Sequence, residues 1–309
     1  MNIRTVKSDF LLLLTAAIWG FAFVAQRMGM EFVGPFLFNA IRFALGTAAM
    51  LPFVLRTRRK PKRAGVMPGL VGCLAAGIFL FLGSSLQQVG IVYTTAGKAG
   101  FITGLYVIIV PFIGVFFKHK IGFGNWTGAI LAAVGLYFLT ITNAFIIQKG
   151  DFLVFLSAFF WAAHVHIIAW LAPQIESSRI AMLQFAIVSI LSFFVAFAIE
   201  SFALCDIFNA AIPILYGGLM SVGVAYTLQV VAQKYAPPTH AAIILSLEAV
   251  FAVLGGWLVL SEMLSRRSVL GCAFMLTGML ISHVGSGFRP SRRIKASIYE
   301  HSPQKDKLI

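Results

Sequence analysis

Long apolar stretches, each about as long as a membrane-spanning helix, follow one another along almost the whole chain. A helix needs about 20 apolar residues to cross a hydrocarbon core of roughly 30 Å. Polar and turn residues divide the chain into ten such stretches. We therefore predict membrane helices at residues 9–26, 34–55, 67–90, 96–117, 125–143, 151–171, 180–200, 210–232, 238–260 and 268–286. The connections are short, which leaves no room for a soluble catalytic domain.

Composition agrees with this pattern. The 309 residues are 60% hydrophobic and only 11% charged, whereas soluble domains carry about 25% charged residues. The predicted fold class is an all-α integral membrane protein. The cysteines show neither disulfide nor metal-ligand spacing, so we interpret them as packing residues; they are Cys73, Cys205 and Cys272.

The second half of the chain repeats the first at an offset of 142 residues. Recurring pairs include Asp9 and Asp151, Trp19 and Trp161, Phe43 and Phe185, Gln87 and Gln229, and Tyr93 and Tyr235. We assign one five-helix repeat to residues 1–143, a second to 144–287 and a basic tail to 288–309. Five is an odd number, so the second copy must cross the membrane in the opposite direction. Inverted repeats are typical of secondary transporters, whose substrate site lies between the repeats near the midplane.

The net charge is +14, and its distribution indicates an orientation. Most Lys and Arg residues fall on the side of the two termini. The positive-inside rule therefore places both termini in the cytoplasm, as expected for a multi-pass protein of a plasma membrane or bacterial inner membrane. Such loops also attract anionic lipids. We do not expect nucleic-acid binding, because no recognition module is present.

The first apolar run follows Arg4 and Lys7 and could be mistaken for a signal peptide. We reject that interpretation because the run recurs inside the chain as the sixth helix.

His164 and His166 lie two residues apart and so on different helical faces, which argues against a metal site. A histidine satisfied by its neighbours is the favoured interpretation, with His164 the better candidate for facing a cavity. Nucleotide, nicotinamide and flavin fingerprints are missing, so no cofactor is implied. The spacing of the histidines and cysteines predicts no metal site.

Four segments together resemble a known family. They are Leu86–Pro111, the pair Trp19 and Gly20, FNAIRF at 38–43 and LEAVFAVLGGWLVLSE at 247–262. They are similar to the EamA type of the drug/metabolite transporter superfamily, over about residues 8 to 287. The resemblance implies a ten-helix carrier with inverted repeats, in a family that includes exporters of amino acids, other metabolites and drugs.

Two positions bear on helix kinks. Relatives often read Leu-Glu-Pro in the ninth helix, where this chain has Ala249, so the kink expected there is in doubt. Pro111 lies well inside the fourth helix, and we expect a kink at that residue.

Glu248 is the first candidate site residue. It lies about ten residues from either end of an apolar helix, near the membrane midplane, where a charge is costly. We favour a substrate-amine or proton site over a packing role. Its counterpart in the first repeat is Tyr106, and the repeat symmetry would place both side chains near a central cavity.

Other polar residues leave alternatives open. For Arg42 we favour a structural tie, to Asn39 or a backbone carbonyl, over a substrate-anion site. Gln87 and Gln229 suit interhelical hydrogen bonds and cavity lining equally. Trp19 and Trp161 would either wall the substrate or pack. Lys98 and His240 begin the fourth and ninth helices, where they would either attract anionic substrate groups, as basic residues do in the similar sugar-phosphate carriers, or be solvated.

The predicted function is a secondary transporter that moves a small metabolite or drug, more often outward, by alternating access. A titratable glutamate would allow proton antiport, whereas a uniporter would need no coupling. The protein would act as a monomer or homodimer. Alternatives are a non-transporting scaffold or sensor, and a sugar-phosphate or nucleotide-sugar exchanger. An intramembrane enzyme is disfavoured, because zincin and rhomboid-like motifs and a paired aspartate are missing.

Overall fold

The structure is a computed structural model that describes residues 3–56, 66–118, 121–140, 149–260 and 265–285. All regular structure in these ranges is helical, which confirms the all-α membrane architecture. The predicted basic tail at 288–309 lies outside the described residues. Eight apolar segments are long enough to cross a membrane, and two shorter apolar segments, Phe123–Phe138 and Val269–Val284, complete the set.

The described helices group into ten membrane segments. The first repeat contains α1 (Ile3–Gly29), α2 (Pro35–Arg56), α3 (Val66–Val92), the pair α4 (Ala96–Gly104) and α5 (Tyr106–Phe116), and α6 (Phe123–Thr140). The second repeat begins with α7 (Lys149–Leu171) and α8 (Ser177–Ile199), followed by the short helix α9 (Leu204–Asn209). Its remaining segments are α10 (Ala211–Leu215) with η1 (Tyr216–Tyr226) and α11 (Thr227–Ala232), α12 (Pro238–Leu245) with α13 (Glu248–Leu260), and α14 (Arg266–Gly285).

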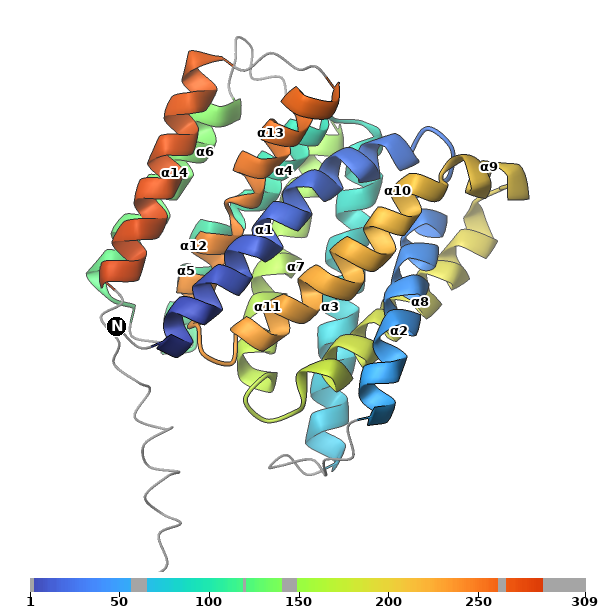
Figure 1. The fold of residues 1–309 in the computed structure, drawn as a ribbon, viewed down its shortest axis with the longest axis horizontal. Helices are drawn as coiled ribbons and strands as arrows, with labels where there is room; N and C mark the ends of the chain where they lie inside the picture. The colour runs from blue at the N-terminus through green and yellow to red at the C-terminus, as the bar shows by residue number, and fades with distance from the viewer. Residues whose placement is uncertain (1–2, 57–65, 119–120, 141–148, 261–264, 286–309) are drawn as a thin grey trace, which may run out of the picture.

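The two repeats interleave in the bundle. Helix α3 packs on α7, α2 on α8, α1 on α13 and α6 on α14, so each of these contacts joins one helix from each repeat. The pair α6 and α14 lies at one side of the bundle and the pair α2 and α8 at the other (Figure 1). At Gly128 and Gly278 the backbones of α6 and α14 approach so closely that an added Cβ would lie about 2.6–2.7 Å from a carbonyl oxygen.

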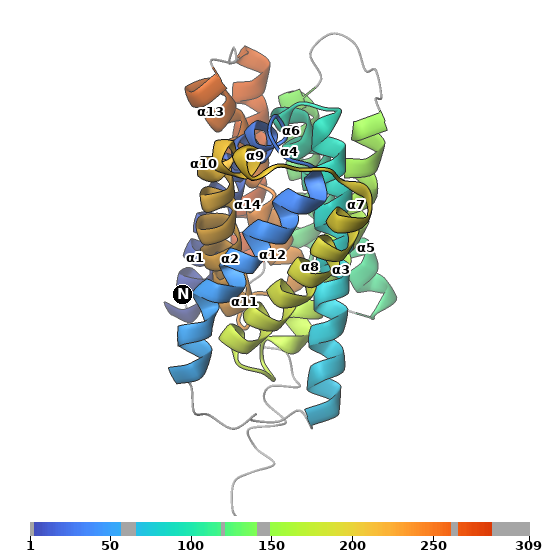
Figure 2. The same cartoon turned by 90° about the vertical axis from the view of Figure 1, so that its right-hand side faces the viewer.

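The equivalent helices run in opposite directions. The chain passes from α4 to α5 in one direction across the bundle and from α12 to α13 in the other (Figures 1 and 2). This is the arrangement that an inverted repeat of five segments requires.

Two of the segments are interrupted at equivalent positions. The fourth turns at Leu105, where Leu105 N–H donates to Ile102 O at 3.2 Å. The ninth turns at Ser246 and Leu247, where Leu247 N–H donates to Ile244 O at 3.1 Å. The fourth segment is thus interrupted at Leu105, whereas Pro111, the expected kink position, lies inside α5. The ninth is interrupted even though Ala249 replaces the proline.

The eighth segment departs from a continuous α-helix. Its middle, Tyr216–Tyr226, is a π-helix, a form that is rare and frequent at functional sites. This segment supplies side chains to the central cavity described next.

Candidate functional site

A cavity lies between the two repeats at the level of the helix interruptions. Its lining comes from both halves of the chain: Trp19, Phe23, Gln26, Arg42, Gln87, Thr103 and Tyr106 from the first, and Trp161, Val165, Ser221, Tyr226, Gln229, Leu245 and Glu248 from the second. Six of the nine candidate residues from the sequence are among these side chains: Trp19, Gln87, Tyr106, Trp161, Gln229 and Glu248.

Glu248 and Tyr106 each begin a helix that resumes after an interruption. Glu248 is the first residue of α13 and Tyr106 the first of α5. Both residues are only 3% exposed, and they lie within electrostatic reach of each other. The carboxyl group of Glu248 and the hydroxyl group of Tyr106 interact with each other. Both residues line the cavity, so the repeats bring one polar pair to it.

Arg42 lies in the same cavity and is also 3% exposed. Its Nε donates to Asn39 Oδ1 at 2.9 Å, and its guanidinium lies 5.1 Å from the centre of the Phe43 ring. The tie to Asn39 is therefore present, but Arg42 also lines the cavity. Among the described residues, neither Arg42 nor Glu248 has an opposite charge within ion-pair distance. The cavity thus holds one guanidinium and one carboxyl group, neither of which has an ion-pair partner among the described residues.

Aromatic rings form one wall of the cavity. Tyr226 has its ring centre 4.6 Å from that of Trp19 and 6.1 Å from that of Trp161, to which it lies nearly parallel. Tyr226 was missed in the sequence, because its counterpart in the first repeat is Ser84 and the comparison of repeats does not single it out. A bulky tyrosine within a segment rich in glycine was the available signal.

The repeated tryptophans, Trp19 and Trp161, form different hydrogen bonds in the two halves, and so do the repeated glutamines, Gln87 and Gln229. Trp161 Nε1 donates to Gln87 Oε1 at 2.8 Å. The equivalent indole, Trp19, donates instead to the backbone oxygen of Ser221 at 3.3 Å, and Gln229 Oε1 has no hydrogen-bond partner among the described residues. Ser221, which accepts the Trp19 bond, lies in the π-helix, whereas the repeat symmetry would predict Gln229 as the acceptor.

The other three candidates are not among the lining residues, although the His164 ring lies behind the cavity wall, 6.2 Å from the ring centre of Trp161 and 6.4 Å from that of Tyr226. His164 is buried, and its Nε2 lies 2.9 Å from Oε1 of Gln184. Lys98 Nζ lies 3.3 Å from Asp151 Oδ2, and His240 Nε2 lies 3.0 Å from Asp9 Oδ1.

These two contacts, of Lys98 with Asp151 and of His240 with Asp9, are equivalent in the two repeats. Each joins the first helix of one repeat to the fourth segment of the other, α7 to α4 and α1 to α12. The starts of α4 and α12 lie at opposite ends of the bundle (Figure 1). The sequence identified both bases but not their carboxylate partners, Asp151 and Asp9, because the partners come from the other repeat.

Known proteins share this architecture. A crystal structure that is 16% identical matches with a TM-score of 0.72, over 93% of this chain and 98% of that one, and so shares the fold. An "Uncharacterized transporter" of Archaeoglobus fulgidus is 32% identical over 91% of this chain and 87% of its own length. A "Probable amino-acid metabolite efflux pump" of Escherichia coli is 22% identical over 93% and 98%.

The model of the EamA-like transporter family matches the chain twice, at residues 6–141 and 148–283. The two matches coincide with the two sets of five membrane segments. The chain therefore belongs to the EamA-like transporter family.

Proposed function

We propose that this transporter exports a small amino-acid metabolite across a plasma membrane or bacterial inner membrane, with both termini in the cytoplasm. The observation that carries the proposal is the presence of two buried ionisable side chains, Arg42 and Glu248, in one cavity between the repeats, with no ion-pair partner among the described residues. A buried charge without a partner is costly, and in a membrane segment it marks a substrate or ion path.

A zwitterionic amino acid offers a partner to each charge. Arg42 presents a planar guanidinium, which suits a carboxylate, and Glu248 would accept the ammonium group. The aromatic wall formed by Trp19, Trp161 and Tyr226 would pack against an apolar or aromatic side chain of the substrate. The ring faces would also attract the substrate ammonium group. Relatives named as amino-acid metabolite efflux pumps support this substrate class.

Alternating access follows from the inverted repeats. Opening one end of the bundle would separate Asp9 from His240, and opening the other would separate Lys98 from Asp151. The interruptions at Leu105 and at Ser246 would serve as hinges, because they leave short helices that can tilt independently. Glu248 would bind the substrate ammonium group in one half of the cycle and a proton in the other. This alternation would couple export of the substrate to entry of a proton.

Exchange of sugar phosphates fits the site less well. A phosphate group needs a surplus of positive charge, whereas Arg42 shares the cavity with Glu248. The bases Lys98 and His240 face carboxylates at the ends of the bundle instead.

A thermal-stability screen of the purified protein in detergent tests the proposal. The compounds are amino acids, polyamines, nucleosides, sugar phosphates and cationic drugs. A ligand at 100 times its dissociation constant should add about 2.7 kcal/mol. We expect amino acids with apolar side chains to stabilise the protein, and their methyl esters and N-acetyl derivatives to lose the effect. Counterflow in proteoliposomes would then confirm transport. Equal stabilisation by the esters, or stabilisation by sugar phosphates alone, would contradict the proposal.

A further inference from the structure

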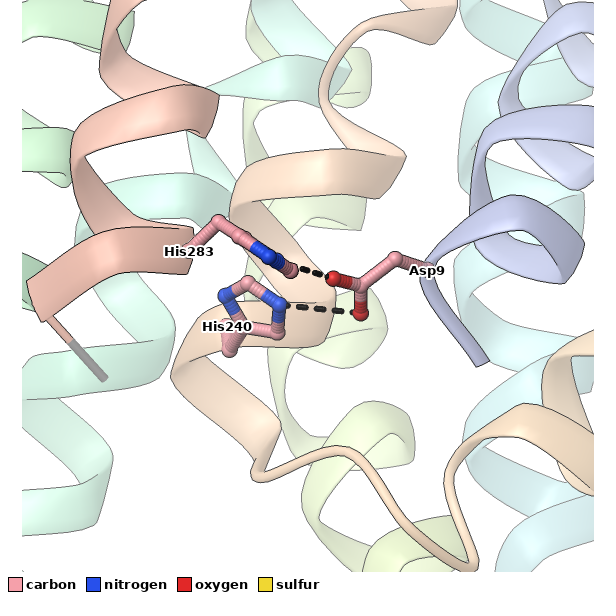
Figure 3. Close-up of side chains that lie close together, drawn as sticks. All are labelled: Asp9, His240 and His283. Carbon is pink, nitrogen blue, oxygen red and sulfur yellow. Dashed lines mark hydrogen bonds and ion pairs between the residues drawn. The ribbon is translucent and has the colours of Figure 1, made fainter. Parts of the chain in front are cut away.

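Three side chains that are far apart in the sequence meet at the end of the bundle where α1 begins. They are Asp9 of α1, His240 of α12 and His283 of α14 (Figure 3). His240 Nε2 lies 3.0 Å from one carboxylate oxygen of Asp9, and His283 Nδ1 lies 2.5 Å from the other. One ligand atom from each residue lies within 4.8 Å of the other two. The cluster is separate from the central cavity, whose lining includes none of the three residues.

A chain of hydrogen bonds fixes the tautomer of His240. Ser282 donates its hydroxyl proton to Asn125 Oδ1 at 2.8 Å, so the Ser282 oxygen accepts from the Nδ1–H of His240 at 3.0 Å. A neutral imidazole with its hydrogen on Nδ1 presents a lone pair at Nε2. That lone pair would face a carboxylate oxygen of Asp9 at 3.0 Å. Two acceptors at this distance need a cation between them, which is either a proton on Nε2 or a metal ion.

The geometry points to a transition-metal dication of the zinc type, bound by Asp9, His240 and His283. The three residues come from three different helices and offer one ligand atom each, which is the number of protein ligands that an open zinc site uses, with water in the fourth position. Two ligand atoms bound to one zinc ion in tetrahedral geometry, at roughly 2.0–2.1 Å, lie about 3.3 Å apart. Small rotations of the Asp9 and His283 side chains would bring the three ligand atoms to that spacing.

The ligand set and its surroundings select the kind of metal. Two imidazoles and one carboxylate suit zinc, cobalt or nickel, whereas magnesium and calcium prefer oxygen ligands. Ser282 and Asn125 supply the outer hydrogen bonds that orient a metal-binding histidine. The side chain of His240 is only 2% exposed, while those of Asp9 and His283 are 17% and 26% exposed. A metal ion therefore has a route from solvent to the three residues. The sequence alone did not predict this site.

Among the described residues, a cluster of three such ligands is present at this end of the bundle and not at the other. Its equivalent at the other end contains Lys98 and Asp151, and the residue equivalent to His283 is Ile141. Lysine and isoleucine do not supply such ligands. A metal at Asp9, His240 and His283 would fasten α1 of the first repeat to α12 and α14 of the second, and would hold that end of the transporter closed.

Metal titration of the full-length, untagged protein in detergent tests this inference. After treatment with a chelator, the protein is titrated with Zn²⁺, Co²⁺ or Mg²⁺ alone. We expect one Zn²⁺ or Co²⁺ per chain, a visible Co²⁺ spectrum of a four-coordinate site, and no response to Mg²⁺. Asp9→Asn and His283→Gln should each weaken Zn²⁺ binding at least 10-fold, and Ser282→Ala should weaken it about 10- to 100-fold.

Two further variants make the result decisive. His166→Gln removes a histidine that bonds Val110 O at 2.8 Å, and it should leave Zn²⁺ affinity unchanged. His283→Cys should keep the metal and add a sulfur charge-transfer band to the Co²⁺ spectrum, a gain that a misfolded variant would not give. Binding of less than one metal per chain, or binding that His283→Gln does not weaken, would overturn the inference and leave the cluster as a proton-held ion pair.

Discussion

Tyr106 and Glu248 occupy equivalent positions in the two repeats, and each is the first residue of a helix that resumes after an interruption. The amino end of a helix carries a partial positive charge. The starts of α5 and α13 both lie at the cavity between the repeats, where Tyr106 supplies a phenol and Glu248 a carboxyl group. The symmetry sets the geometry, while the residue types make the two halves of the site chemically different.

Replacing Glu248 by Gln should abolish or uncouple transport without unfolding the protein. Removing one charge of a buried ion pair with the substrate costs about 2–5 kcal/mol, or at least roughly a 30-fold loss of affinity. Counterflow in proteoliposomes measures the loss, and thermal unfolding checks the fold. Glu31→Gln, at an exposed residue, serves as the control. Loss of expression or stability with Glu248→Gln would instead indicate a packing role.

Replacing Arg42 by Lys should weaken binding of carboxylate-bearing substrates while sparing simple amines. Lysine keeps the charge but loses the planar fork and the bond from Nε to Asn39 Oδ1. We expect a fall of about 10-fold or more in affinity for an amino acid and little change for the corresponding amine. Ligand-induced thermal shifts for the two compounds provide the comparison. Equal losses for both would show that Arg42 acts only through the structure.

Gly20 permits the close approach of α1 to α13. A Cβ at Gly20 would lie 2.3 Å from Phe251 Cβ and 2.7 Å from the carbonyl oxygen of Glu248. Gly20→Ala should therefore destabilise the protein by about 1–3 kcal/mol, measured by thermal unfolding. Gly97→Ala is the matched control, because nothing lies within 4 Å of the added atom. An unchanged melting temperature for Gly20→Ala would contradict this packing.

The two equivalent tryptophans should respond differently to loss of the indole N–H. Trp161→Phe leaves the buried Gln87 Oε1 without its donor at 2.8 Å, which costs about 1–3 kcal/mol. Trp19→Phe removes only a longer bond, of 3.3 Å, to the Ser221 carbonyl, and should cost less. Chemical unfolding of the two variants measures the difference. Equal costs would mean that the bond between Trp161 and Gln87 adds nothing.

The ion pair between Lys98 and Asp151 should show a measurable coupling energy. Lys98 is one-third exposed and Asp151 is 8% exposed, and Thr94 also donates to Asp151 at 2.6 Å. In a double-mutant cycle with Lys98→Met and Asp151→Asn, we expect a coupling of about 1 kcal/mol. Additive effects within error would argue against a role for this pair in closing its end of the bundle.

The sequence by itself determined the architecture. The length of each apolar stretch defines a membrane segment, and the recurrence of Asp9 as Asp151 and of Trp19 as Trp161 defines two copies of an odd number of segments. Both signals lie along the chain and need no knowledge of contacts. Glu248 and Tyr106 also stood out, because a charged or polar side chain in an apolar helix is visible without a structure.

Only the tertiary structure decided which polar side chains meet. His164 bonds Gln184, Lys98 and His240 each face an aspartate of the other repeat, and Asp9 lies beside His283 across 274 residues of sequence. Hydropathy does not fix these contacts, because lipid is as apolar as the protein interior and the rotation of a membrane helix about its axis leaves little trace in its pattern. That rotation is set by packing between helices of the two repeats.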